Sequence, residues 1–503
     1  MAEEPAAGGP RAAGRPAAAG EGGAALGYIS FLAGAAALGG FLFGFDSAVI
    51  NGAVGGLQRA FHASSAGTGF AVAAILVGCA LGALAAGPCA ERLGRRAVML
   101  ATAVVFAATA VWAGVAATAW TFTLARLLSG LGVGAASVVC PAYIAEISPA
   151  RVRGRLGSLQ QLGIVVGIFI ALLSDQMLAR AAGGASAPLW AGIAAWRWMF
   201  LVEVAPAVLF GAAVLAVPES PRFLVAARRE AEALAVLRRI EPAAAEAEVA
   251  AIRATVRQDR APRLADVRGP AGGLLPIVWT GIGLAVLQQL VGINSIFYYG
   301  SVLWQAVGFS AADALGINVA TGLVNLVSTL VAMAFVDRVG RRPLLLWGSV
   351  GMAATLGTLT AVLATAGGAG GAGGAGGAGG GHGAAGGIVL TGHSGLVALL
   401  AVNLFVFAFG VSWGPCVWIL LGEMFPNRIR GAALSLAVFA EWIANWLVTV
   451  SFPSAVTSLG PAAAYGGYCV FAGLSFLFVL RRVRETRGRS LEDMDAQAVG
   501  AGA

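Results

Sequence analysis

Lysine is absent from this sequence. All 32 residues of the lysine and arginine class are arginine, and charged residues make up only 11% of the 503-residue chain. Because alanine and glycine are abundant, we interpret the missing lysine as the codon bias of a GC-rich genome. The formal net charge is +8, but the arginines fall in alternate connecting segments and not on one surface. This distribution argues against a nucleic-acid partner.

Cysteine and histidine are also scarce. The five cysteines lie in or at the ends of apolar stretches, and their spacing matches neither a disulfide framework nor a metal site. The three histidines lie in or beside connecting loops, away from the acids that are embedded in apolar segments. We therefore expect no metal, no cofactor and no catalytic constellation, so the chain is not predicted to be an enzyme.

Apolar residues dominate what is present: 58% of the chain is hydrophobic and the mean hydropathy is +0.83. Runs long enough to cross a bilayer as a helix recur about twelve times. They lie near 28–57, 68–90, 97–117, 120–145, 155–178, 194–217, 274–306, 313–336, 343–365, 395–421, 430–455 and 463–481. Since these runs do not alternate in hydrophobicity as membrane strands do, we predict an all-α membrane protein with twelve transmembrane helices.

The arginines predict the topology. Alternate loops carry the basic clusters, which lie at 92–96, 151–155, 222–268, 338–342, 428–430 and 481–489. The other loops hold little beyond Arg59 and Arg180. Because basic loops stay in the cytoplasm, both termini are expected there, in a multi-pass protein of the plasma membrane, or of the inner membrane if the source is bacterial.

The chain repeats itself. The segment Glu91–Arg96 recurs as Asp337–Arg342, and Glu146–Gly154 recurs as Glu423–Gly431. The second copies are farther apart because a stretch of glycine and alanine lies between them at 367–387. This pattern predicts two pseudo-symmetric six-helix bundles in the same orientation.

The repeat also gives the domain limits. We predict a disordered tail at 1–24, bundles at 25–217 and 273–482, a linker of short cytoplasmic helices at 218–272, a glycine-rich outer loop at 366–394 and a cytoplasmic tail at 483–503. The outer loop contains matches to G-x-G-x-x-G, but no strand precedes them. We therefore interpret it as a flexible loop and not as a nucleotide site.

The apolar stretch 288–299 carries amides and phenols that need polar partners. An unpaired amide in apolar surroundings costs roughly 2–7 kcal/mol. On a straight helix Gln289 and Asn294 would lie about 140° apart, but a break at Gly292 would turn both into one cavity. The stretch is either a helix contact held by buried amides or a binding site for a small molecule rich in hydroxyls.

Three ionisable residues, Asp46, Arg126 and Glu203, fall inside the first, fourth and sixth predicted spans. Isolated charges within a membrane are costly and usually functional. A permanent Asp46–Arg126 pair that only holds two spans together is the alternative interpretation.

The repeated halves, the arginine-rich loops and the segment Pro218–Arg222 resemble the sugar porter family of the major facilitator superfamily. The similarity runs from about Gly39 to Met494, and further matching segments lie at 44–50, 160–163, 414–418 and 485–488. The sequence departs from the family pattern at Glu91, Glu441 and Arg484, where the family usually has aspartate, an amide and proline.

The resemblance implies where sugar would be bound. The implied contacts are Gln161, Gln288, Gln289, Asn294, Asn325 and Trp418, with Tyr298, Glu441, Trp442 and Asn445 nearby. Amides suit a sugar because they donate and accept hydrogen bonds without bringing a charge into the membrane. Apolar sugar faces pack on aromatic rings. Glu441 would either accept a sugar hydroxyl as a carboxylate or be held protonated by burial.

The resemblance also implies proton coupling. In proton-coupled members, acids matching Asp46 and Glu203 and an arginine matching Arg126 form the proton relay, whereas facilitative glucose transporters typically have asparagine in place of Asp46. The duplicated loops indicate a cytoplasmic gate made by Glu91, Arg92, Glu146, Arg153, Asp337, Arg338, Arg341, Glu423 and Arg430. These groups alternatively cap helix ends or follow the positive-inside rule.

The sequence thus predicts a carrier that moves a monosaccharide, hexose or pentose, by alternating access with proton symport. Its expected partners are the sugar, the co-transported proton and the lipid bilayer, and we expect a monomer. A facilitative uniporter with the same site is the first alternative. A non-transporting sugar receptor of the same fold is the second, although such sensors usually carry a long cytoplasmic tail.

Overall fold

The computed structural model describes residues 19–149, 152–258, 267–268, 273–371, 393–425 and 429–485. Within these residues, twelve helical segments are long and apolar enough to cross a membrane. This agrees with the number of spans predicted from the sequence. Helices are the expected form because a lipid environment requires each segment to pair its own backbone groups.

The first bundle contains eight α-helices in chain order. They are α1 (Ala19–Ala48), α2 (Ile50–Phe61), α3 (Ser65–Leu93), α4 (Arg95–Val115), α5 (Ala119–Ile147), α6 (Arg153–Ala182), α7 (Ala195–Leu201) and α8 (Val204–Ala216). A short 3-10 turn, η1 (Trp190–Gly192), precedes α7. Helix α1 begins before the predicted bundle start at residue 25, and residues 1–18 of the predicted tail lie outside the described residues.

Three short helices, α9 (Pro221–Ala226), α10 (Glu230–Ile240) and α11 (Ala245–Gln258), join the bundles. Short helices in this linker were predicted from its helical periodicity. Leu224, Leu237 and Val249 belong to a small apolar core of their own. On its surface Arg229 pairs with Glu232 at 2.7 Å, and this hydrogen bond lowers the pKa of the Glu232 carboxyl.

The second bundle repeats the arrangement of the first. Its helices are α12 (Pro276–Leu290), α13 (Ile293–Ala306), α14 (Ala311–Val339), α15 (Arg341–Gly371), α16 (His393–Val411), α17 (Trp413–Met424), α18 (Arg430–Leu459) and α19 (Pro461–Arg482). Helices α15 and α16 extend into the ends of the predicted outer loop at 366–394. The rest of that loop and residues 486–503 of the predicted tail lie outside the described residues.

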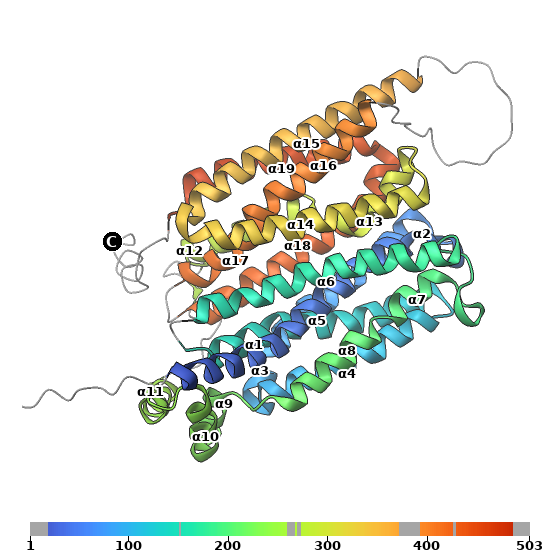
Figure 1. Ribbon diagram of the computed structural model, residues 1–503. Helices are drawn as coiled ribbons and strands as arrows, with labels where there is room; N and C mark the ends of the chain where they lie inside the picture. Colours follow the sequence, from blue (N-terminus) through green and yellow to red (C-terminus); the bar gives the residue numbers. More distant parts are fainter. Residues whose placement is uncertain are drawn as a thin grey trace, which may run out of the picture.

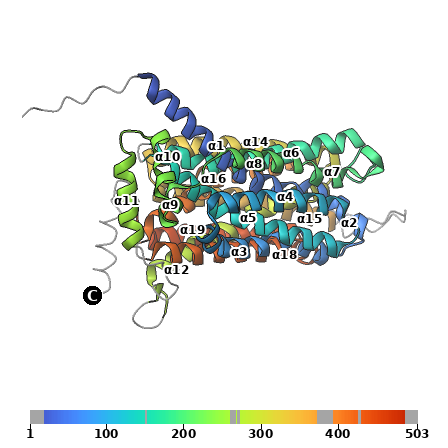
Figure 2. The same ribbon diagram turned by 90° about the horizontal axis from the view of Figure 1, so that it is seen from below.

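The two bundles lie side by side (Figure 1). Helix α3 packs on α18, α6 packs on α14, and α2 packs on α13, so each of these contacts joins one bundle to the other. Figure 2 shows the long helices running between the end that carries α9, α10 and α11 and the end that carries α2 and α7. A space between the bundles is therefore closed on its sides by α3 with α18 and by α6 with α14.

Several spans are broken into two consecutive helices. The first span is α1 with α2, the sixth α7 with α8, the seventh α12 with α13, and the tenth α16 with α17. At the break in the seventh span Gly292 has φ +83°, a left-handed conformation that glycine adopts without steric cost. The predicted break at Gly292 is therefore present, and it separates Gln289 from Asn294.

We expect Gly292→Ala to destabilise the protein. A Cβ at this position would lie 2.6 Å from Cγ of Tyr468, and the backbone conformation disfavours any side chain. The combined cost is about 1–3 kcal/mol, measured as a lower melting temperature of the purified protein in detergent. Gly473→Ala in α19 is the control, since nothing lies within 4 Å of its Cβ position. Equal melting temperatures for the two variants would contradict this explanation.

Candidate functional site

The break at Gly292 brings the amides of two helices together. Gln288 and Gln289 lie in the last turn of α12, and Asn294 lies in the first turn of α13. The Nδ2 atom of Asn294 donates to Oε1 of Gln289 at 2.6 Å. One unbroken helix would have directed these side chains apart, so the local break creates a shared polar surface.

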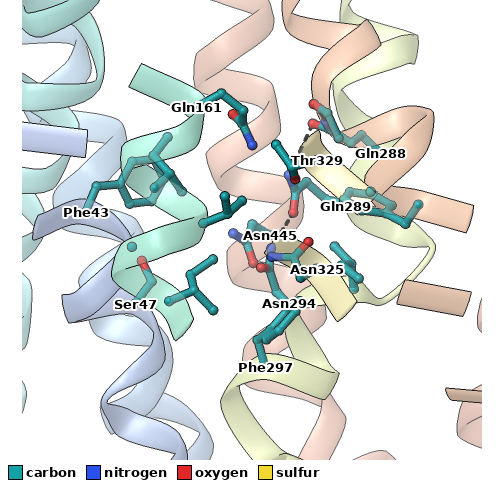
Figure 3. A pocket seen from close by; sticks show the side chains of 18 of the residues that line it. Phe43, Ser47, Gln161, Gln288, Gln289, Asn294, Phe297, Asn325, Thr329 and Asn445 are labelled. Carbon is teal, nitrogen blue, oxygen red and sulfur yellow. Dashed lines mark hydrogen bonds between the residues drawn. The ribbon is translucent and has the colours of Figure 1, made fainter. Parts of the chain in front are cut away.

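A cavity lies between the bundles and receives these amides (Figure 3). Phe43 and Ser47 of α1 and Gln161 of α6 face it from the first bundle, opposite the amides of the second. The empty space inside it is about 870 Å³, including its opening.

The structure brings all the predicted sugar contacts to this cavity. They are Gln161, Gln288, Gln289, Asn294, Tyr298, Asn325, Trp418, Glu441, Trp442 and Asn445. Ser47, Phe297 and Thr329 also line the cavity but were not predicted from the sequence. Thr329 follows Asn325 by one helical turn on α14, and this spacing was the signal that would have identified it.

Hydrogen bonds fix the orientation of the amides. Gln289 Nε2 donates to Glu441 Oε1 at 3.0 Å, and Gln288 Nε2 donates to the carbonyl oxygen of Trp413 at 2.9 Å. Asn294 donates to Gln289, so the amides form a connected chain. A site held in this way is organised before a ligand arrives, which reduces the entropy lost on binding.

Aromatic rings line the apolar part of the cavity. Trp418 and Trp442 contribute from α17 and α18, and Phe43 contributes from α1. The rings of Phe43 and Trp442 have centroids 5.6 Å apart and therefore join the two bundles. Apolar rings beside amides are suited to a ring-shaped ligand that has hydroxyls at its edge and C–H groups on its faces.

A second polar cluster is buried inside the first bundle. Arg126 Nη1 is paired with Asp46 Oδ1, and Ser129 Oγ donates to the other carboxylate oxygen. Arg126 Nη2 also donates to the backbone oxygen of Asp46 at 3.0 Å. Glu203 lines a small void with these residues. Asp46, Arg126 and Glu203 are each 2% exposed or less, so the three predicted intramembrane charges lie together.

Helix α1 connects the two polar regions. Asp46 faces α5, while its neighbour Ser47 and the preceding Gly44 line the cavity. If α1 moves when a ligand binds in the cavity, the distance between Asp46 and Arg126 would therefore change.

One intramembrane acid was missed. Asp175 of α6 is fully buried, and its Oδ2 accepts a hydrogen bond from the backbone N–H of Gly52 at 3.1 Å. It lies inside the predicted run 155–178, so the rule that was applied to Asp46 would have found it.

Asn51 of α2 forms hydrogen bonds between the bundles. Helix α2 lies at the end of the molecule opposite α9–α11 (Figure 1). Asn51 Nδ2 donates to the carbonyl oxygen of Phe297 at 2.8 Å. Its Oδ1 accepts from Ser301 N at 3.2 Å and from Asn318 Nδ2 at 2.7 Å. Asn51 is 1% exposed, so α2 closes against α13 and α14 at this end.

Charged groups form ion pairs and hydrogen bonds at the end of the molecule that carries α9–α11. In the first bundle Arg95 Nη2 contacts Glu146 Oε1 at 2.9 Å, and the Glu219 carboxylate accepts the backbone N–H of Arg95 at 3.0 Å. In the second, Arg341 Nη2 contacts Glu423 Oε1 at 3.0 Å. These contacts stabilise the N-terminal ends of α4 and α15, where backbone N–H groups lack helical partners.

The predicted gate residues are only partly placed. Glu146, Arg341 and Glu423 form the pairs just described, and each pair lies within one bundle. Glu91, Arg92 and Arg338 are exposed, and the side chains of Arg153, Asp337 and Arg430 lie outside the described residues. Arg95 was missed, although the sequence repeat matches it to Arg341. Glu219 and Glu485 were also missed; Glu485 accepts the N–H of Arg341 at 3.1 Å.

Comparison with known proteins identifies the family. The model of the family described as sugar (and other) transporter matches residues 32–498. This chain belongs to the sugar transporter family. It is 50% identical over 468 residues to the glucose transport protein of Synechocystis sp., with 93% of this chain and 97% of that protein covered.

Three further matches agree with this family assignment. This sugar transporter family member is 34% identical over 506 residues to the D-xylose-proton symporter of Escherichia coli K12, with coverage of 93% and 95%. The inward open conformation of the E. coli xylose transporter XylE matches with a TM-score of 0.77 at 32% identity, over 93% of this chain and 100% of that one. XylE bound to 6-bromo-6-deoxy-D-glucose matches with a TM-score of 0.75 at 33% identity, over 94% and 99%.

These matches confirm the predicted family and the twelve-helix major facilitator fold. The sugar transporter family member is a multi-pass membrane protein, and the relatives it resembles are transport proteins.

Proposed function

We propose that this protein carries a monosaccharide across the membrane by alternating access, coupled to the movement of a proton. The observation that carries the proposal is the cavity itself. Amides from α6, α12, α13, α14 and α18 converge there beside aromatic rings, in the middle of a membrane-spanning fold. Such a cavity can exchange hydrogen bonds with water for hydrogen bonds with hydroxyls.

The relatives support a hexose or pentose as the substrate. The 50% identical Synechocystis protein is named for glucose transport, and the E. coli symporter is named for D-xylose. In their pyranose forms, glucose and xylose carry the same ring hydroxyls, and glucose has an additional hydroxymethyl group. The substrate class therefore agrees with a cavity that presents several amides to one ring.

Proton coupling is supported by the buried cluster around Asp46. A proton on Asp46 would remove the charge that pairs with Arg126, and α1 would then be free to change its position relative to α5. Because α1 also lines the cavity, sugar and proton would act on the same helix. Glu203, which lines the same small void, would be the second acid of the relay.

Alternating access is supported by the contacts of Asn51. They close the end that carries α2 and α13. We assign the closed end to the outside, with both termini and α9–α11 in the cytoplasm, because the arginine-rich loops lie at the opposite end. We further propose that the charged groups around Glu146 and Glu423 hold the cytoplasmic ends of the two bundles together when the carrier opens outward. We also propose that the carrier acts as a monomer.

We expect Asn51→Ala to increase the fraction of molecules whose outer end is open. The substitution removes hydrogen bonds to α13 and α14, each worth about 1 kcal/mol. A cysteine at Ser47 in the cavity should then react about tenfold faster with an impermeant thiol reagent added outside intact cells. Asn403→Ala is the control because the Asn403 side chain donates to its own helix, at Leu399 O. An unchanged reaction rate would show that Asn51 does not hold this end closed.

The function is tested with purified protein in proteoliposomes. Labelled glucose, xylose, galactose and arabinose are offered with and without an inward proton gradient, and protein-free vesicles are the control. We expect one or more sugars to equilibrate without the gradient and to accumulate with it. Equal final levels under both conditions would make the protein a uniporter. No uptake of any monosaccharide would refute the proposed function.

A further inference from the structure

Glu441 gives the cavity an electrostatic character that a plain sugar does not require. Among the described residues that line the cavity, Glu441 is the only acid, and these residues include no arginine, lysine or histidine. The amides already supply donors and acceptors for hydroxyls. An acid at this position therefore adds a preference among sugars.

The carboxylate of Glu441 is only half satisfied. Its Oε1 accepts from Gln289 Nε2 at 3.0 Å, whereas Oε2 is buried and has no hydrogen-bond partner among the described residues. The side chain is 5% exposed. A carboxylate accepts up to about four hydrogen bonds, and leaving one oxygen without a donor in a buried site is costly. A bound ligand is the natural source of the missing donor.

Arg126, the one arginine that is buried among the described residues, is not available to supply it. Arg126 belongs to the first bundle, where it is engaged by Asp46. The Gln289 side chain is engaged as well, since its Oε1 accepts from Asn294 while its Nε2 donates to Glu441. When Glu441 is ionised, the charge that balances it therefore arrives with the ligand.

Aromatic rings beside Glu441 favour a cation. Trp442 follows it on α18 and packs on Phe43, with ring centroids 5.6 Å apart. The faces of aromatic rings attract ammonium groups within about 6 Å. A carboxylate oxygen without a donor, in a cavity that indole and phenyl rings also line, is a combination that recognises a protonated amine.

We propose that this cavity binds aminosugars, monosaccharides in which one hydroxyl is replaced by an ammonium group, and that the ammonium binds to Glu441 Oε2. The amides Gln288, Gln289 and Asn294 bind the remaining hydroxyls. This inference rests on the proposed function, because it names the substrate class of the same site. A charge-assisted hydrogen bond of this kind corresponds to roughly a 10- to 100-fold gain in affinity.

The test compares matched pairs of ligands on the purified protein. Labelled glucose or xylose is bound at pH 7 without a gradient, and unlabelled sugars are added to displace it. The displacing affinity of 2-amino-2-deoxyglucose is compared with that of 2-deoxyglucose. The corresponding 3- and 6-substituted pairs are compared in the same way. For the wild type we expect the amine to bind at least 10-fold more tightly than its deoxy partner at one or more positions. In Glu441→Gln this ratio should fall to about one. In Gln161→Ala, which alters another cavity side chain, both members of a pair should weaken together.

The outcomes separate this inference from the proposed function. Ratios near one at every position in the wild type would overturn the inference without any variant. A high ratio that persists in Glu441→Gln would remove Glu441 as the cause. Wild-type ratios near one, together with a neutral-sugar affinity whose pH dependence disappears in Glu441→Gln, would mean that Glu441 carries a proton instead. If no neutral sugar binds at all, the proposed function itself fails.

Discussion

Asp46→Asn is expected to abolish uphill sugar accumulation while sugar exchange across the membrane continues. Asparagine cannot take up and release a proton, so the movement of α1 is no longer tied to the proton gradient. One proton driven by about 100 mV supplies roughly 2.3 kcal/mol, enough for roughly 50-fold accumulation. In proteoliposomes with an inward proton gradient, the final internal sugar concentration of this variant should equal the external one.

Asp175→Asn is the matched control for this experiment. Asp175 is also a buried aspartate of the first bundle, but it accepts a hydrogen bond from the Gly52 N–H, which an asparagine oxygen still accepts. This variant should accumulate sugar as the wild type does. If Asp46→Asn also concentrates sugar against a gradient, Asp46 is not the coupling acid and its pair with Arg126 only holds α1 to α5.

Gln289→Ala is expected to weaken sugar binding more than any other single amide substitution. Gln289 accepts from Asn294 at 2.6 Å and donates to Glu441 at 3.0 Å, so its removal leaves both groups without their partner and frees them to turn. A lost ligand contact combined with buried groups left unpaired costs about 2–4 kcal/mol. We expect the dissociation constant to rise about 30- to 1,000-fold in equilibrium binding to the purified protein.

Gln160→Ala controls for the general effect of removing a buried glutamine. Gln160 and Gln289 are each 8% exposed, but Gln160 does not line the cavity. Its alanine variant should keep the wild-type dissociation constant, whatever its effect on the melting temperature. Equal losses of affinity in the two variants would mean that Gln289 acts through the fold and not through contact with the ligand.

Much of the fold was predictable because a membrane imposes a simple rule. Each apolar run of bilayer length must be a helix, and the repeated segments at 91–96 and 337–342 gave the two bundles. The polar residues of the cavity were predictable for the same reason. An amide such as Gln289 has no stable place facing lipid, so it had to face a polar space.

The contacts between the bundles could not be predicted in this way. Asn51 lies in the first span, and its partners Phe297, Ser301 and Asn318 are in the other bundle. Neither hydropathy nor helical periodicity indicates which faces of two bundles meet. Arg95 illustrates a different limit: the sequence showed several adjacent arginines, and only the fold shows which of them reaches Glu146.

A structure of the purified protein with a bound hexose or pentose tests the central claim most directly. We predict sugar density between the two bundles, within hydrogen-bond distance of Gln289 and Asn294 and packed against Trp418. Density at any other place, or a cavity that stays empty at a sugar concentration that saturates uptake, would contradict the account.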